Sequence, residues 1–516
     1  MSDPSPSTET VAYRSLSETA ALLAAGELTS SDLVATLLRR MEDVNRSGPE
    51  IRAVIAPCED APDHAERLDQ ERDRGSVRGP LHGIPVLVKD NVDTAGTEGT
   101  TAGSLALAAS LGRPVRDAAV VESLRKAGAI VLSKANMSEW ANFRGDRSSS
   151  GWSAMGGQCR NPHGLNRSPG GSSSGSGAGV AAGLAPLAVG TETNGSILCP
   201  AALNGVVGIK PTVGLTSRRG VVPISATQDT VGPLARTVAG AAALLDVLAT
   251  SSPDPEDPAT AAAPFVSAGT YLAACVAGGL AGVRIGVPRS VYFGYSPKAD
   301  RLVELALEAA ATEGATVLEG AEIPSARELV ESDDENTVLQ FEFKSGLEEY
   351  FAARPLGDSS PRNLEELVAF NRAHATDELA YFGQEIVERA AATRGLADPS
   401  YLAAKARSLK RGRDDGIDAA LAGSGADVLV VPTMGPAWCI DHVNGDSAPG
   451  SGYKAAAVAG YPAVSVPVGF AGGLPVGLCV MGTAWSEALL IRVAYGIEQA
   501  LGLGESLRPA FAESIT

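Results

Sequence analysis

Three segments of the chain carry a lysine and two serines in settings where proton transfer is feasible. Lys89 follows an apolar run, Ser172 lies in a Gly/Ser-rich loop, and Ser196 lies in a Thr-Asn-Gly-Ser turn. A serine hydroxyl becomes a good nucleophile when a neighbouring base takes its proton. A lysine with its ordinary pKa of about 10.4 is protonated at neutral pH, but burial disfavours the ammonium and lowers that pKa. Lys89 is therefore a candidate base, and each serine is a candidate nucleophile or proton carrier.

The stretches around these residues resemble the amidase signature family. They follow the family's order along the chain: HGIPVLVKDN at 82–91, GGSSSG at 170–175, GTETNGSI at 190–197 and GIKPT at 208–212. The resemblance implies that Ser196 is the nucleophile, that Ser172 is a bridging serine after a cis peptide bond, and that Lys89 is the base. The serines are 196 − 172 = 24 residues apart, which matches the family. Such an enzyme hydrolyses amides through an acyl-enzyme, without a cofactor.

The turn that carries Ser196 also offers hydrogen-bond donors to a reacting amide. The backbone N–H groups of Thr193, Asn194, Gly195 and Ser196 precede an expected helix, and we predict that they form the oxyanion hole. Donors fixed at such a place are each worth roughly 3 kcal/mol to the transition state. Gly195 suits a backbone that must approach the substrate closely, because it has no Cβ.

Within the family, the chain is most similar to bacterial peptide amidases, which release ammonia from the C-terminal amides of peptides. The similar stretches are SEWANFR at 138–144, GWSA at 151–154, residues 191–203 and MGTAWSE at 481–487. The resemblance implies a small-molecule or short-peptide amide as the substrate. The candidate substrate-binding side chains are Asn142, Phe143, Arg144, Trp152, Ser173 and Trp438.

Two positions depart from the pattern of relatives. Many of them, including the amidotransferase subunit that serves glutaminyl-tRNA, carry an arginine two places after the nucleophile, where this chain has Leu198. An apolar residue removes a partner for a substrate carboxylate, so small acidic amides and glutamine are disfavoured as substrates. Asn194 stands where the peptide amidases are expected to have an acidic residue, which changes the polar contact at the scissile amide.

Other interpretations of these residues stay open. The GSSSG stretch also fits the nucleophile motif of α/β-hydrolases, with Ser173 as nucleophile and His374 or His442 as base. Lys134 and Lys210 follow apolar runs too and compete with the first lysine for the role of base. A broad aryl or aliphatic acylamidase, or an amidotransferase-type subunit that works only with partners, would share the family motifs.

The composition excludes several classes of partner. With 42 basic and 60 acidic residues the net charge is −18, which disfavours binding to a nucleic-acid backbone or an anionic membrane. No apolar stretch reaches the roughly 20 residues of a membrane span and no signal peptide is visible, so we expect a cytoplasmic protein. The six cysteines and five histidines lack the spacing of a zinc site, so no metal is expected. The oligomeric state stays open.

Apolar runs alternate with helical patterns along most of the chain, which predicts an α/β fold. Together with the resemblance, this predicts one domain over 1–516 with the amidase signature fold: a central mixed, largely parallel sheet covered by helices on both faces. Residues 80–240 would form the catalytic signature core, and the charged amphipathic helices of 325–420 a cover near the substrate entrance. Strands are expected at 83–88, 130–132, 187–189, 283–287, 315–318, 428–431, 463–468 and 476–480, and a final helix at 486–501.

Overall fold

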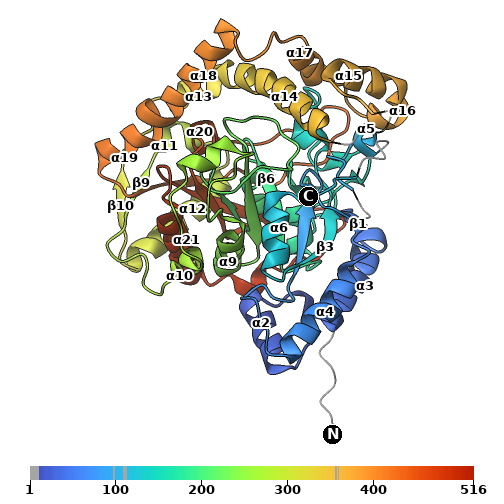
Figure 1. The fold of residues 1–516 in the computed structure, drawn as a ribbon. Helices are drawn as coiled ribbons and strands as arrows, with labels where there is room; N and C mark the ends of the chain where they lie inside the picture. Colours follow the sequence, from blue (N-terminus) through green and yellow to red (C-terminus); the bar gives the residue numbers. More distant parts are fainter. Residues whose placement is uncertain (1–10, 97–98, 109–112, 355–356, 358–359, 516) are drawn as a thin grey trace.

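An 11-stranded sheet lies at the centre of the protein (Figure 1). The computed structural model describes residues 11–96, 99–108, 113–354, 357 and 360–515. The predicted strands are present within it. In spatial order the sheet consists of β1 (Val54–Pro57), β3 (Ile130–Ala135), β2 (Pro85–Lys89), β6 (Leu187–Glu192), β8 (Thr230–Ala235), β7 (Val207–Lys210), β12 (Ala463–Ala471), β13 (Leu474–Met481), β11 (Val428–Pro432), β9 (Arg284–Val287) and β10 (Thr316–Glu319).

Strand direction makes the sheet mixed, as predicted. Parallel pairing occurs in two groups, β3–β2–β6 and β11–β9–β10. The strands between these groups, and β1 at the edge, pair antiparallel with their neighbours. β12 and β13 form a hairpin around Gly472 and Gly473, which both have positive φ, as a two-residue type I′ turn requires. The first parallel group carries the candidate base at the end of β2.

Helices cover both faces of the sheet. On one face Gly179 of α7 lies against Leu87 of β2, where a Cβ would come within 2.6 Å of the leucine side chain. On the other face Gly240 of α9 lies beside Leu187 of β6, and α9 packs against α6 and α21. Small residues thus let α7 approach the sheet closely. The bounds of these helices are α6 (Ala119–Lys126), α7 (Ser174–Ala181), α8 (Leu198–Leu203), α9 (Val238–Leu248), α12 (Pro297–Thr312) and α21 (Glu487–Leu501).

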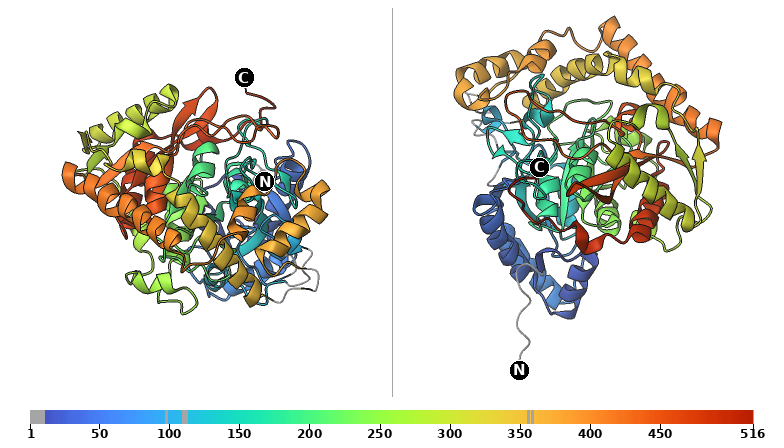
Figure 2. Two further views of the ribbon diagram at one scale, coloured as in Figure 1. Left: turned by 90° about the horizontal axis from the view of Figure 1, so that it is seen from above. Right: turned by 180° about the vertical axis from the view of Figure 1, so that it is seen from behind.

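A layer of helices between residues 326 and 424 arches over one end of the sheet, in yellow and orange in Figure 1 and from two other sides in Figure 2. It corresponds to the helices expected at 325–420. At the opposite end α2 (Leu16–Ala25), α3 (Ser30–Arg40) and α4 (Ala61–Asp73) project from the sheet. The layer consists of α13 (Ala326–Glu331), α14 (Asp334–Ala353), α15 (Leu364–Ala373), α16 (Ala375–Glu378), α17 (Glu385–Ala391), α18 (Pro399–Gly412) and α19 (Asp418–Ser424).

Strands β7 and β8 of the sheet are not among the strands predicted from the sequence. β8 contains Gly232 and Pro233, residues that weaken the prediction of a strand interior. In the structure Pro233 pairs with Val189 of β6 in an antiparallel ladder. The strand is therefore determined by its neighbours in the sheet rather than by its own composition.

Three further features of the described residues concern membrane spans, metal sites and cysteines. No helix of the described chain is both long and apolar enough to cross a membrane. Across the same residues, no group of three or more His, Cys, Asp or Glu side chains is arranged to hold a metal ion. The six cysteines are free thiols, and four of them are buried: Cys58, Cys159, Cys199 and Cys479.

Candidate active site

Lys89, the last residue of β2, keeps its amine inside the protein. The residue is 0% exposed. Its Nζ lies 2.7 Å from Ser172 Oγ, 2.8 Å from Thr191 Oγ1 and 3.2 Å from the Thr191 carbonyl oxygen. Burial lowers the pKa of Lys89 to about 7, although the carboxylates of Asp229 and Glu192 act in the opposite direction. A substantial fraction of the amine is therefore neutral at neutral pH and able to accept a proton.

The loop before α7 holds Ser172 against this amine. The peptide bond between Gly171 and Ser172 is cis, as the resemblance implies. A Cβ on Gly171 would lie 2.2 Å from Ser138 Oγ, so only glycine fits there. Next along the chain, Ser173 Oγ donates to the Thr191 carbonyl at 3.0 Å and accepts the Thr191 N–H at 3.2 Å. These two bonds fix the serine loop to β6. The structure assigns Ser173 to this internal role rather than to the substrate.

Ser196 lies in the turn from β6 to α8, 7% exposed. Gly195 has φ +82°, and a Cβ there would come within 2.3 Å of the Tyr453 ring. Glu192, at the end of β6, accepts the N–H groups of Ile197 at 2.7 Å and Leu198 at 2.9 Å. The buried Glu192 carboxylate therefore holds the turn that carries Ser196, and the close approach of the Tyr453 ring requires glycine at position 195.

The two serine loops are joined through the main chain. The Ser173 N–H donates to the Ser196 carbonyl at 3.0 Å. In the part of the chain that is described, no hydrogen bond joins Ser172 Oγ directly to Ser196 Oγ. Catalytic hydrogen bonds often tighten only when substrate is bound. The structure thus brings Lys89 and Ser172 into contact and places Ser196 in the adjoining loop, whereas proton transfer between the two hydroxyls stays a prediction.

Thr191 is a member of this site that the sequence reasoning missed. Its Oγ1 accepts from Lys89 and, at 3.0 Å, from Asn91 Nδ2. Further along the same turn, Thr193 Oγ1 donates to Asp229 at 2.6 Å, and this carboxylate also accepts backbone N–H groups at 224 and 225. Thr191 lies inside the GTETNGS stretch, so its position was a usable signal. Asp229 has no such signal, because only the tertiary fold brings it there.

Helix α14 of the cover reaches the turn that carries Ser196. Asn194 Nδ2 donates to Glu335 Oε1 at 2.7 Å, Gln228 Nε2 donates to the same oxygen at 3.0 Å, and Lys454 Nζ lies 3.3 Å from Oε2. Because a carboxylate only accepts, the Asn194 amide turns its nitrogen toward Glu335 and its oxygen away. That Oδ1 is buried and has no hydrogen-bond partner among the described residues.

Arg144 and Trp152 lie at the seam between the core and the cover. Arg144 is 0% exposed and lies 2.5 Å from Glu139 Oε1 and 3.6 Å from Glu378 Oε2. Its guanidinium lies 3.9 Å from the Phe382 ring centroid, and Trp152 packs edge-on against the same ring at 5.2 Å. Both side chains therefore have internal partners, and the structure assigns them to the seam rather than to the substrate.

Replacing Arg144 with methionine is expected to lower the free energy of unfolding by about 3–5 kcal/mol, because it leaves two buried carboxylates without their cation. Denaturant unfolding measures this loss. Arg284→Ala, which breaks the exposed pair with Asp427, should change stability by less than about 1 kcal/mol. A raised KM with unchanged stability would instead indicate that Arg144 contacts the substrate.

The other three candidate substrate residues have different surroundings in the structure. Phe143 packs edge-on against Phe343 of α14 at 5.3 Å. Asn142 has φ +70° and a buried Oδ1 without a hydrogen-bond partner in the described chain. Trp438 shares a buried apolar cluster with Leu198, the residue two places after Ser196. Their contact with a substrate stays a prediction.

The competing bases lie elsewhere. Lys134 donates to Thr100 Oγ1 at 3.1 Å, and Lys210 to the Pro211 carbonyl at 3.0 Å. His374 Nδ1 lies 2.9 Å from the Phe370 carbonyl oxygen. His442 Nε2 lies 2.8 Å from Gln158 Oε1. None of these contacts is with a serine of the candidate site, so Lys89 is the base that the structure supports.

Comparison with known proteins agrees with this fold. The family model described as Amidase matches residues 32–491. A probable amidase of Arabidopsis thaliana is 40% identical over 481 residues, which cover 92% of this chain and 87% of that protein. The chain therefore belongs to the amidase family, and it is a hydrolase that acts on amides.

Two solved structures and one further relative are also similar to this chain over most of its length. The native peptide amidase of Stenotrophomonas maltophilia is 48% identical, with a TM-score of 0.89 and coverage of 96% of this chain and 98% of that one. A structure of peptide amidase with the competitive inhibitor chymostatin is 49% identical, with a TM-score of 0.88 and coverage of 94% and 97%. A glutamyl-tRNA(Gln) amidotransferase subunit of Symbiobacterium thermophilum is 36% identical over 507 residues, which cover 95% of this chain and 97% of that protein.

Proposed function

We propose that this chain hydrolyses the C-terminal amides of peptides to the free acid and ammonia, with Ser196 as nucleophile, Ser172 as proton relay and Lys89 as base. One observation carries the proposal: the buried Lys89 amine lies 2.7 Å from Ser172 Oγ and has a pKa of about 7. Similarity to a peptide amidase over most of the chain supports the substrate class.

The reaction then proceeds in two halves. Ser196 Oγ attacks the amide carbon while its proton passes to Ser172 and the Ser172 proton passes to Lys89. The backbone N–H groups of residues 193–196 donate hydrogen bonds to the oxyanion that forms. The C–N bond breaks as Lys89 returns the proton through Ser172 to the nitrogen, and ammonia leaves. Water, deprotonated by the same relay, attacks the acyl-enzyme and releases the acid. The unpartnered Asn194 Oδ1 can accept an N–H of the substrate amide.

The relay predicts a pH profile. Only the neutral amine accepts a proton, so kcat/KM for a peptide amide without other titrating groups should rise through about pH 7 and level off above it. Asp229 raises the pKa of Lys89, so Asp229→Asn should move this rise to lower pH. A profile that is flat between about pH 5 and 9, or a shift in the opposite direction, would contradict the assignment of the base.

Ammonia release by the purified chain from an N-acetylated, amidated dipeptide tests the function. We expect turnover by the chain alone, no turnover by Ser196→Ala, and slower cleavage of anilides and simple aliphatic amides. Preference for the anilides would instead indicate a broad acylamidase. Activity that appears only after partner proteins are added would indicate an amidotransferase-type role, as the similarity to the Symbiobacterium thermophilum protein allows. The apolar environment of Leu198 favours the hydrolase.

A further inference from the structure

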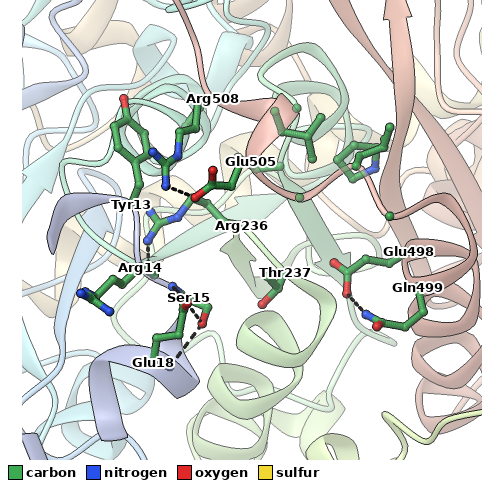
Figure 3. A pocket seen from close by; sticks show the side chains of 18 residues that line it. Tyr13, Arg14, Ser15, Glu18, Arg236, Thr237, Glu498, Gln499, Glu505 and Arg508 are labelled. Carbon is green, nitrogen blue, oxygen red and sulfur yellow. Dashed lines mark hydrogen bonds and ion pairs between the residues drawn. The ribbon is translucent and has the colours of Figure 1, made fainter. Parts of the chain in front are cut away.

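A cavity of about 460 Å³ lies between the N-terminal segment, the start of α9, the end of α21 and the C-terminal tail (Figure 3). Its volume is within the range of small-molecule sites, roughly 300–1,000 Å³. It contains charged side chains of both signs. Figure 3 shows Arg14, Arg236 and Arg508 around Tyr13 on one side, together with Glu18 and Glu505, whereas Glu498 lies with Gln499 on the other side.

The arginine side has donors without acceptors in the described chain. Arg236 uses Nη1 on the Val180 carbonyl at 3.2 Å and Nη2 on the Arg14 carbonyl, but its Nε is buried without a hydrogen-bond partner. The Nε of Arg14 is buried and unpartnered too. Arg508 lies over the Tyr13 ring, and its ion-pair partner Glu505 is 84% exposed. Glu18, the other carboxylate on this side, is bonded to the N-cap Ser15. An added carboxylate at this side would meet the positive charges of Arg236 and Arg508, and the Arg508 side chain is 40% exposed.

The opposite side has a carboxylate without a cation. Glu498 Oε1 accepts the Val238 N–H at 2.8 Å, and Oε2 has only a 3.5 Å contact with Gln499 Nε2. No ion pair is formed by Glu498 within the described chain. The C-terminal end of α21 lies beside it, where unpaired carbonyl groups add partial negative charge. An ammonium group would be stabilised at this side.

This cavity is separate from the candidate active site. It contacts Ala181 and Gly205–Val206, which lie at or just past the C-terminal ends of α7 and α8. Ser172 and Ser196 precede the opposite ends of the same helices. The eight residues of α7 span about 12 Å. A ligand in the cavity therefore does not compete for the catalytic serines.

We infer that this cavity binds a zwitterionic short peptide, with the peptide carboxylate at Arg236 and Arg508 and its ammonium at Glu498. A free dipeptide or tripeptide carries both charges in one small molecule, so it can meet the guanidinium groups on one side and Glu498 on the other. A simple anion would leave Glu498 without a cation, and a simple cation would not use the positive charge of Arg236 and Arg508. The site does not depend on the identity of the catalytic residues.

Hydrogen–deuterium exchange of the full chain with glycyl-leucine tests the site, because it reports where binding occurs. At about 10 mM dipeptide we expect slower exchange in residues 11–18 and 498–508. N-acetyl-glycyl-leucine lacks the ammonium and glycyl-leucinol lacks the carboxylate, so each should bind at least tenfold more weakly. Absence of protection with glycyl-leucine, or equal protection by all three compounds, would overturn the inference.

Two substitutions test the two ends separately. Glu498→Gln keeps an acceptor for the Val238 N–H but removes the charge, and Arg508→Gln removes a partly exposed guanidinium; each should weaken glycyl-leucine binding about tenfold. Arg284→Gln, in the exposed pair with Asp427, is the matched control and should bind normally. Unchanged exchange elsewhere in the chain shows that each variant is folded. Normal affinity in both Glu498→Gln and Arg508→Gln would refute the placement of the charges.

Discussion

Replacing Ser196 with alanine is expected to lower kcat for an amidated dipeptide by about 10⁴-fold or more, because it removes the atom that forms the acyl-enzyme. The turn itself should survive, since Glu192 and Gly195 hold it through main-chain contacts. KM should change little. Single-turnover ammonia release measures the effect.

The control for this variant is Ser133→Ala. Ser133 is a fully buried serine of β3 whose Oγ has no hydrogen-bond partner among the described residues, so its loss should leave both stability and kcat near their original values. If the Ser196→Ala protein kept more than about one hundredth of the activity, the nucleophile would have to be another residue.

Replacing Lys89 is expected to lower kcat by about 10²–10⁴-fold, the usual contribution of a general base. Lys89→Arg keeps the charge but cannot lose its proton at neutral pH, and Lys89→Met keeps the length without the amine. The methionine variant should fold, since it removes a buried amine and leaves Thr191 Oγ1 bonded to Asn91. In both variants the rise in rate near pH 7 should disappear.

A double variant tests whether lysine and bridging serine act as one relay. Ser172→Ala should cause a loss of the same order as Lys89→Met, and the combination should be little worse than either alone. If the loss in kcat of the double variant equals the product of the two single losses, the two residues act independently. The relay would then be wrong even if both residues contribute to catalysis.

The serine turn also bears on the choice between hydrolysis and amide transfer. Leu198, at the position where many relatives carry an arginine, is fully buried in an apolar cluster with Trp438 and Tyr453. A substrate with a free carboxylate close to the scissile amide would thus lose its charge-assisted bond there. A peptide amide places a neutral group at this position, which agrees with the proposed function.

The substrate-facing residues were the least predictable part of the site. Arg144 and Trp152 lie in stretches that match peptide amidases, and the sequence alone does not distinguish a contact with substrate from one with the protein itself. In the structure both contact Phe382, which lies in the cover and far away along the chain. Their role depends on where the helical cover packs, and local sequence does not contain that information.

The sequence by itself determined the elements and the reactive side chains: the apolar run before Lys89, the glycines that the two serine loops require, and the alternation of strands and helices. These are local properties, set by side-chain size, backbone freedom and periodicity. Tertiary structure alone decided the insertion of β8 beside β6, the arrival of Asp229 and Glu335 at the serine turn, and the charged cavity between the chain's two ends. Each of these joins residues distant in sequence, and the pKa of Lys89 depends on that assembly because burial, which only folding supplies, is its main cause.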